Sequence, residues 1–180
     1  MQRYIIEDTR HVPPFNQPAS LLTIGTRPLK IHHEDVFLRY LRKGIELGNT
    51  FTSAEQMATI QGPAVVYRDS LWFDIEFLST FLEQAQASGR ACRAAFPADD
   101  VGFRTYTLPL AQGFEYATDA NGFPIFLADL WYFPGEYTTD VLPIVVPSDS
   151  EEMGFYSVPD FMSMEQGNLT HYGPARAIVS

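Results

Sequence analysis

The segment 63–96 constrains the fold of this 180-residue chain more than any other stretch, because it predicts a strand, a helix and a second strand in succession. Residues 64–67, Ala-Val-Val-Tyr, form a short apolar run after a Gly-Pro break, as is typical of a buried strand. Asp74 is suited to cap the following helix by accepting a backbone N–H from its first turn. Gly89 suits the helix end, since glycine tolerates the left-handed conformation found there, and residues 91–96 return to the sheet.

The helix of this segment has one apolar face. Its apolar side chains recur at three- and four-residue steps, and they are Phe77, Leu78, Phe81, Leu82 and Ala85. A strand–helix–strand unit of this length normally forms a right-handed crossover between parallel strands. The first strand ends in Arg68-Asp69, at the edge where open α/β sheets hold ligands. The segment therefore predicts an α/β fold with a charge pair at its ligand-binding edge.

Further elements are predicted before this unit. Residues 4–6 and 21–25 are extended segments, separated by a proline-rich loop whose missing N–H donors disfavour a helix. Residues 33–47 show apolar positions at helical spacing. Thr52 and Glu55 have the spacing of a capping box and predict a short helix that begins there.

The half of the chain after residue 96 has a different pattern. Its β-rich runs, separated by Gly, Pro, Asn and Asp, are residues 102–110, 123–132, 141–146 and 155–158. Asn121-Gly122 is a strong hairpin signal. We expect antiparallel or mixed strands here, added to the first unit within a single domain of residues 1–164. Residues 165–180 are expected to be a C-terminal tail or linker.

Composition excludes some partners. The formal charge of −10 and a pI of about 4.7 argue against a nucleic-acid backbone, which demands a basic face. No apolar run approaches the roughly 20 residues that a membrane-spanning helix needs, so no membrane is expected as partner. The single cysteine, Cys92, cannot form an internal disulfide and favours a cytoplasmic location. It is interpreted as a small buried apolar residue, with a reactive thiol as the alternative.

The run His32-His33-Glu34-Asp35 is the densest set of metal-ligating residue types. Adjacent side chains on a helix do not face one another, whereas ligand pairs usually stand three or four residues apart. A polar helix start is the favoured interpretation, and a metal site the alternative.

Asp69 is the stronger candidate for chemistry. An aspartate just past a buried strand can hold Mg²⁺ through a carboxylate oxygen. Asp8 follows the first strand and Asp129 lies in a later one, so two or three carboxylates would converge if those strands were neighbours. The alternative is that Asp69 pairs with Arg68 or caps a turn.

Other reaction signatures are absent from the sequence. It has no G-x-S-x-G elbow, no phosphate-binding P-loop and no G-x-G-x-x-G fingerprint. The aromatic runs 131–133 and 72–73 are suited to stack on a base or sugar, or else to form core or a surface for a partner domain.

Two stretches resemble the sugar-phosphate nucleotidyltransferases. Residues 21–33, LLTIGTRPLKIHH, resemble the family's segment that leads into a helix. Residues 65–74, VVYRDSLWFD, resemble its strand that ends in a metal-binding aspartate. More closely still, the whole chain resembles the divergent nucleotidyltransferase-like domains that precede left-handed β-helix domains in some bacterial proteins. The resemblance implies a three-layer α/β fold with an antiparallel β extension.

The same resemblance implies a site. Asp69 would be the catalytic position and the Mg²⁺ ligand, and Arg10 and Arg27 would be the cations nearest the phosphates of a nucleotide or sugar phosphate. If the chain is active, the reaction would be Mg²⁺-dependent attack of a sugar 1-phosphate on a nucleoside triphosphate.

The sequence departs from this family where phosphate is held. The family's glycine-rich G-x-G-T-R loop is replaced by residues 7–11, Glu-Asp-Thr-Arg-His, and no lysine stands at 18–20. Glycine lets backbone N–H groups approach phosphate closely, and two acidic side chains oppose it. The leading expectation is a degenerate domain, a recognition or assembly module of sugar-nucleotide or cell-envelope metabolism with weak or no transferase activity. The alternative is a non-catalytic interaction or oligomerisation domain that packs through its aromatic surface, against a C-terminal β-helix domain or another copy of itself.

Overall fold

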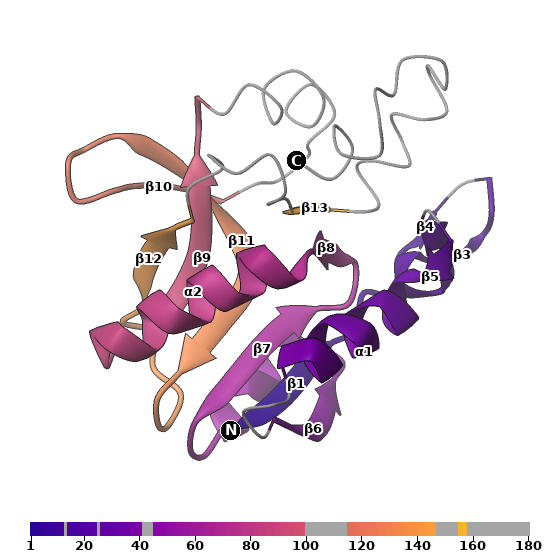
Figure 1. Cartoon of the computed structure of the whole chain (residues 1–180), viewed down its shortest axis with the longest axis horizontal. Helices are drawn as coiled ribbons and strands as arrows, with labels where there is room; N and C mark the ends of the chain where they lie inside the picture. The colour runs from indigo at the N-terminus through magenta and orange to yellow at the C-terminus, as the bar shows by residue number, and fades with distance from the viewer. Residues whose placement is uncertain (13, 25, 41–44, 100–114, 147–154, 158–180) are drawn as a thin grey trace.

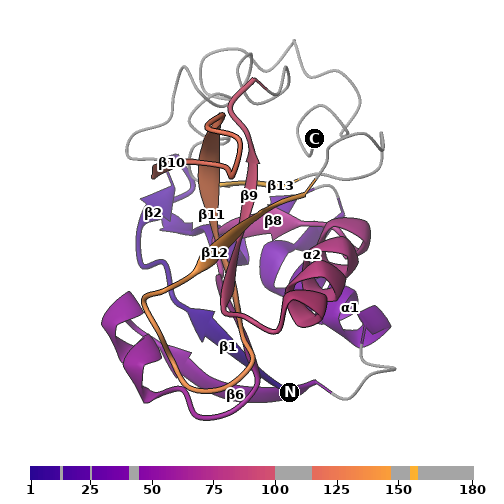
Figure 2. The same ribbon diagram turned by 90° about the vertical axis from the view of Figure 1, so that its left-hand side faces the viewer.

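The structure is a computed structural model that describes the chain except for residues 13, 25, 41–44, 100–114, 147–154 and 158–180. Its centre is a seven-stranded mixed sheet. Helices α1 (Leu29–Tyr40) and α2 (Ile75–Ser88) lie together on one face of that sheet (Figure 1 and Figure 2). This arrangement confirms the predicted α/β class. None of the helices in the described ranges is both long and apolar enough to cross a membrane.

The sheet combines parallel and antiparallel pairs of strands. From one edge to the other they are β12 (Leu142–Val145), β9 (Cys92–Pro97), β11 (Pro124–Phe133), β7 (Ala64–Arg68), β1 (Gln2–Ile6) and β6 (Glu46–Phe51), and β10 (Tyr116–Thr118) pairs with β11. The pairs β6–β1, β1–β7 and β9–β12 are parallel, whereas β11 is antiparallel to both β7 and β9. Strands β7 and β9 therefore run in the same direction, as predicted, but α2 crosses over an intervening strand.

Shorter elements surround the sheet. Three two-stranded ribbons pair β2 (His11–Val12) with β3 (Gln17–Pro18), β4 (Thr23–Ile24) with β5 (Arg27–Pro28), and β8 (Leu71–Phe73) with β13 (Phe155–Ser157). Within the described part of the chain, the 3₁₀-helices are η1 (Ala19–Leu21) and η3 (Ala54–Thr59). The ribbons extend the chain beyond the carboxyl ends of β1 and β7.

The two faces of the sheet carry separate cores, because successive side chains of a strand point to opposite sides. On β7, Val65 and Tyr67 pack with the helices, and Ala64 and Val66 pack on the other face. The predicted apolar stripe of α2 is fully buried against the sheet. The Asp74 carboxylate accepts the Phe77 N–H at 2.7 Å, which confirms the predicted cap.

Helix α1 is held to the ribbon strand β8 by two imidazoles. Nε2 of His32 lies 2.8 Å from the carbonyl oxygen of Phe73, and Nε2 of His33 lies 2.7 Å from that of Leu71. A carbonyl oxygen only accepts, so each Nε2 carries the proton in these contacts. His33 is also buried between the rings of Tyr67 and Phe73.

Several predictions for the first sixty residues were wrong. The predicted helix 33–47 is displaced, since α1 begins at Leu29 and ends at Tyr40, and residues 46–51 form the edge strand β6. Only Phe51 of β6 is buried, so this strand has little apolar pattern to reveal it. The predicted Thr52–Glu55 box is shifted by one residue to Ser53 and Gln56.

The C-terminal half confirms the antiparallel extension in part. Strand β11 matches the predicted run 123–132, and Gly122, at φ 83°, lies in the turn that joins it to β10. Strand β12 instead joins the sheet parallel to β9, and β13 pairs outside the sheet with β8. The predicted run 102–110, the domain end at 164 and the tail 165–180 lie outside the described residues.

Burial of His33 predicts that stability falls with acidification. Burial holds its pKa at about 3, against 6.5 for an ordinary histidine. Below about pH 6.5 the unfolded chain therefore binds a proton that the folded chain does not, so the free energy of unfolding should fall by roughly 2 kcal/mol between pH 7 and pH 5. Urea unfolding followed by tryptophan fluorescence measures this change.

The control pair for this experiment is His33→Gln and His11→Gln. His33→Gln keeps an N–H donor for the Leu71 carbonyl and should remove most of the pH dependence. His11 is exposed, so His11→Gln should leave that dependence as it is. Equal pH dependence in the wild type and His33→Gln would contradict the prediction.

Candidate functional site

Two aspartates meet where β1 and β7 end. The Asp69 carboxylate accepts the backbone N–H of Asp8 at 2.7 Å, and the Asp69 N–H donates to the Ile6 carbonyl at 3.0 Å. Both side chains are largely buried, Asp8 at 4% and Asp69 at 9% exposure. The predicted convergence of acidic groups at this edge is therefore present for Asp8 and Asp69.

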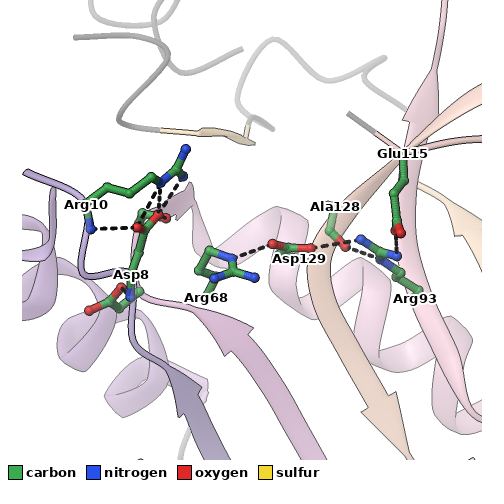
Figure 3. A network of polar contacts seen from close by, with 9 residues as sticks. Asp8, Arg10, Arg68, Arg93, Glu115, Ala128 and Asp129 are labelled. Atoms are coloured by element: carbon green, nitrogen blue, oxygen red, sulfur yellow. Dashed lines mark hydrogen bonds and ion pairs between the residues drawn. The ribbon is translucent and has the colours of Figure 1, made fainter. Parts of the chain in front are cut away.

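The Asp8 carboxylate is held by the residue two positions later. Arg10 donates to it from Nε at 2.9 Å, from a terminal guanidinium nitrogen at 2.6 Å and from its backbone N–H at 3.1 Å (Figure 3). The Ser70 hydroxyl donates to the same carboxylate at 2.7 Å. Burial acts to raise the pKa of Asp8, but these hydrogen bonds outweigh it, and the pKa lies below its ordinary value. Asp8 is therefore an ionised, fully engaged acceptor.

Asp69 has the opposite electrostatic character. Burial raises its pKa, and the neighbouring charges of Asp8 and Glu7 raise it further. Hydrogen bonds from the Asp8 N–H and the Ser20 side chain oppose that rise without cancelling it. Asp69 consequently serves to position the chain at the end of β1.

A second charge network crosses the centre of the sheet. Asp129 on β11 accepts from Arg68 Nε on β7 at 2.5 Å and from Arg93 on β9 at 2.8 Å (Figure 3). Arg93 also pairs with Glu115 and donates from Nε to the Ala128 carbonyl at 2.8 Å. The β9–β11 register shifts between Leu127 and Trp131. The hydrogen bond from Arg93 to the Ala128 carbonyl therefore lies where the backbone ladder is irregular.

These two networks border one open cleft of about 1000 Å³. The cleft lies over the face of β7 and β11 opposite the long helices, since it is lined by Trp131 and Phe133 of the second core. Its charged lining residues are Arg10, Arg68, Arg93, Glu115 and Asp129. Arginine thus outnumbers acid in this lining, although the whole chain carries a formal charge of −10. Thr138 and Thr139 also line the cleft.

The structure separates the three residues proposed from the sequence as a site. Arg10 lines the cleft, but Asp69 is not among its described lining residues, because its carboxylate is turned to the Asp8 N–H. Arg27 pairs with Asp35 beside α1 and borders a different hollow of about 520 Å³. The predicted Arg68–Asp69 pair is also replaced, because Arg68 pairs with Asp129.

The other candidate residues have structural partners. The run 32–35 lies within α1, with the imidazoles on β8 carbonyls, Glu34 on Arg3 and Asp35 on Arg27. Cys92 is buried, and burial raises the pKa of its thiol. The aromatic runs 131–133 and 72–73 are buried in the protein, so they do not form the surface expected for an interaction domain.

Ser70, Arg93 and Glu115 were missed by the sequence reasoning. Arg93 did carry a signal, because it stands among alanines and a cysteine in a strand predicted to be buried, where a charged residue needs a partner. Ser70 and Glu115 carried none, since their roles arise from segments far apart in the sequence.

The donor set at the aspartates does not fit Mg²⁺. This ion requires oxygen ligands at about 2.0–2.1 Å in near-octahedral geometry. The Asp8 oxygens are occupied by Arg10 and Ser70, and the Asp69 carboxylate is bound to a backbone N–H. Among the described residues, no group of three or more His, Cys, Asp or Glu side chains is arranged to hold a metal.

Comparison with known proteins identifies the fold. No protein-family model and no curated protein matches the chain. A candidate glucose-1-phosphate thymidylyltransferase from Bacillus anthracis, solved in complex with a sucrose, is similar over 97% of this chain and 98% of its own, with a TM-score of 0.60 and 8% identity. A hypothetical transferase from Thermus thermophilus is similar over 74% of this chain and 64% of its own, with a TM-score of 0.50 and 11% identity. The chain therefore has a nucleotidyltransferase-like fold.

The network around Asp129 predicts a loss of stability on its removal. Asp129→Ala leaves the half-buried guanidiniums of Arg68 and Arg93 without their shared acceptor, so the free energy of unfolding should fall by about 2 kcal/mol. Asp140→Ala is the matched control, since Asp140 pairs with Arg90 at the exposed surface and such pairs contribute roughly 0–1 kcal/mol. Urea unfolding measures both, and an equal loss would contradict the prediction.

Proposed function

We propose that this domain binds a phosphorylated ligand, a nucleotide or a sugar phosphate, in the arginine-lined cleft, and that it recognises this ligand with weak or no transferase activity. It would thus serve as a recognition or assembly module of sugar-nucleotide or cell-envelope metabolism. The observation that carries the proposal is the presence of Arg10, Arg68 and Arg93 in one cleft of an otherwise acidic chain.

The placement of the cleft supports ligand binding. It borders the carboxyl ends of β1 and β7, and ligands of open α/β sheets bind outside the carboxyl ends of the strands. Guanidinium groups match the geometry of phosphate oxygens through paired N–H donors. Arg68 and Arg93 are held in fixed positions by Asp129, so little side-chain freedom is lost when an anion binds.

The same residues argue against efficient transfer. Phosphoryl and nucleotidyl transfer depend on cationic groups aimed at the charge that develops in the transition state. In this chain Asp8 stands where the resembled family has its phosphate-binding loop, and its carboxylate engages the guanidinium of Arg10. Arg68 and Arg93 are likewise directed at Asp129. The arginines thus provide binding groups, each already paired with a carboxylate of the protein.

Titration calorimetry with UTP, dTTP and glucose 1-phosphate tests this proposal. At least one of them should release or absorb heat on binding, and Arg68→Ala should weaken that binding about tenfold, since hydrogen bonds to charged groups contribute about 1.5–3 kcal/mol. Arg68→Lys keeps the charge but not the paired donors, so its affinity should lie between those of the wild type and Arg68→Ala. Pyrophosphate release from the triphosphate together with the sugar phosphate should stay at background.

Arg90→Ala is the matched control, because Arg90 precedes β9 at its amino end and pairs with Asp140 at the surface. It should bind as the wild type does. Absence of heat with all three ligands would contradict the proposal. Light scattering on the same samples tests the alternative interaction domain, which requires a dimer or a larger species.

A further inference from the structure

We propose that Arg10 is the resident cation of this site, meaning that its guanidinium supplies the positive charge that compensates the Asp8 carboxylate. An anionic ligand then binds the cleft without a divalent metal ion, by engaging this same guanidinium. This inference rests on the proposed ligand-binding function. The sequence resemblance implied a site that depends on Mg²⁺, whereas in the structure the Arg10 guanidinium contacts the Asp8 carboxylate.

The pair of buried aspartates creates the need for a cation. Asp8 and Asp69 are at most 9% exposed and are joined by a single hydrogen bond, from the Asp8 N–H to the Asp69 carboxylate. A buried carboxylate is costly unless an opposite charge and hydrogen bonds compensate it. A metal ion is one means of compensation at such a position, and a guanidinium is another.

The geometry of Asp8 shows that the guanidinium fills this role. An ionised carboxylate offers about four lone-pair positions. Oδ1 receives the Arg10 backbone N–H at 3.1 Å and Nε at 2.9 Å, and Oδ2 receives the terminal Arg10 nitrogen at 2.6 Å and the Ser70 hydroxyl at 2.7 Å. The acceptor capacity of Asp8 is therefore used by this chain's own donors. A metal ion could coordinate Asp8 only after Arg10 had left.

Arg10 is also placed to serve a ligand. Its side chain is 59% exposed, whereas that of its partner Asp8 is 4% exposed. Arg10 lines the same cleft as Arg68, so its exposed side chain borders the space that a phosphate would enter. If Arg10 turns toward a ligand, the Ser70 hydroxyl and the Arg10 backbone N–H still donate to Asp8. Asp8 thus retains two hydrogen bonds during the exchange.

Two measurements test the inference. The first is calorimetry of UTP and dTTP in EDTA and in excess Mg²⁺. Affinity in EDTA should be at least equal to that in Mg²⁺, Arg10→Gln should weaken binding at least about tenfold, and Arg10→Lys should restore part of the loss. Arg90→Gln is the charge-matched control and should bind as the wild type does. Binding that requires Mg²⁺, or that is unchanged in a folded Arg10→Gln, would overturn the inference.

The second measurement needs no organic ligand. Mn²⁺ is added to the protein and its electron paramagnetic resonance spectrum is recorded. We expect that Asp8 and Asp69 do not bind the ion, so the spectrum with Asp8→Asn or Asp69→Asn should equal that with the wild type. A bound Mn²⁺ that is lost in either variant would overturn the inference. Circular dichroism shows whether each variant is folded. If Asp8→Asn does not fold, Asp69→Asn is used for the comparison.

The two proposals fail in different ways. If the wild type gives no heat with any ligand in either buffer, the ligand-binding function fails, and the Mn²⁺ titration alone decides whether Arg10 is the resident cation. If heat appears only in the presence of Mg²⁺, the ligand-binding function stands and the inference about Arg10 fails.

Discussion

The insertion of β11 between β7 and β9 is the constraint on which the rest of the structure depends. This ten-residue strand runs antiparallel to both neighbours and contributes side chains to both cores. It places Asp129 directly between Arg68 on one side and Arg93 on the other. Without it, the two guanidiniums would have no shared acceptor, and the cleft would lose the lining residues that β11 contributes.

Local signals of the sequence predicted the strand–helix–strand unit well. The Asp74 cap, the apolar stripe of α2 and the positive φ of Gly89 each follow from residues within one helix, so a pattern of a few residues is sufficient. Neighbouring elements in space were less predictable. The unit 63–96 indicates that two parallel strands are joined by a helix, but it contains no information about a strand from residues 124–133 that enters between them.

Edge strand β6 was missed for a related reason. Its pairing with β1 is a backbone interaction, and Gly48 leaves the space that the Tyr4 ring occupies, where a Cβ would lie 2.8 Å from a ring carbon.

The sequence predicted where the site lies, but not which residues pair with one another there. Asp8 and Asp69 were expected at the ends of their strands, and they lie together there. The expected Arg68–Asp69 pair did not form because the Asp69 carboxylate, in the turn after β7, accepts the Asp8 N–H, whereas Arg68 pairs with Asp129 of the neighbouring strand β11. Arg27 resembled a phosphate-binding residue by sequence, but the β4–β5 ribbon places it beside Asp35 of α1. Ion pairs between segments far apart in the sequence thus decided which arginines reach the cleft.

The proposal that the cleft binds an anion rather than catalysing a transfer depends on how its charges are oriented. A catalyst gains from charges that interact more strongly with the transition state than with the ground state, and such charges must be oriented before the reaction toward the atoms that change. In this domain the cationic groups are oriented toward Asp8 and Asp129, which belong to the protein itself. A ligand that draws Arg10 away must first compete with a buried carboxylate, so part of the interaction energy is spent equally in the ground state and the transition state. Such an exchange can give selective recognition of an anion by an acidic protein, because only a ligand with closely spaced negative oxygens matches the contact that it replaces.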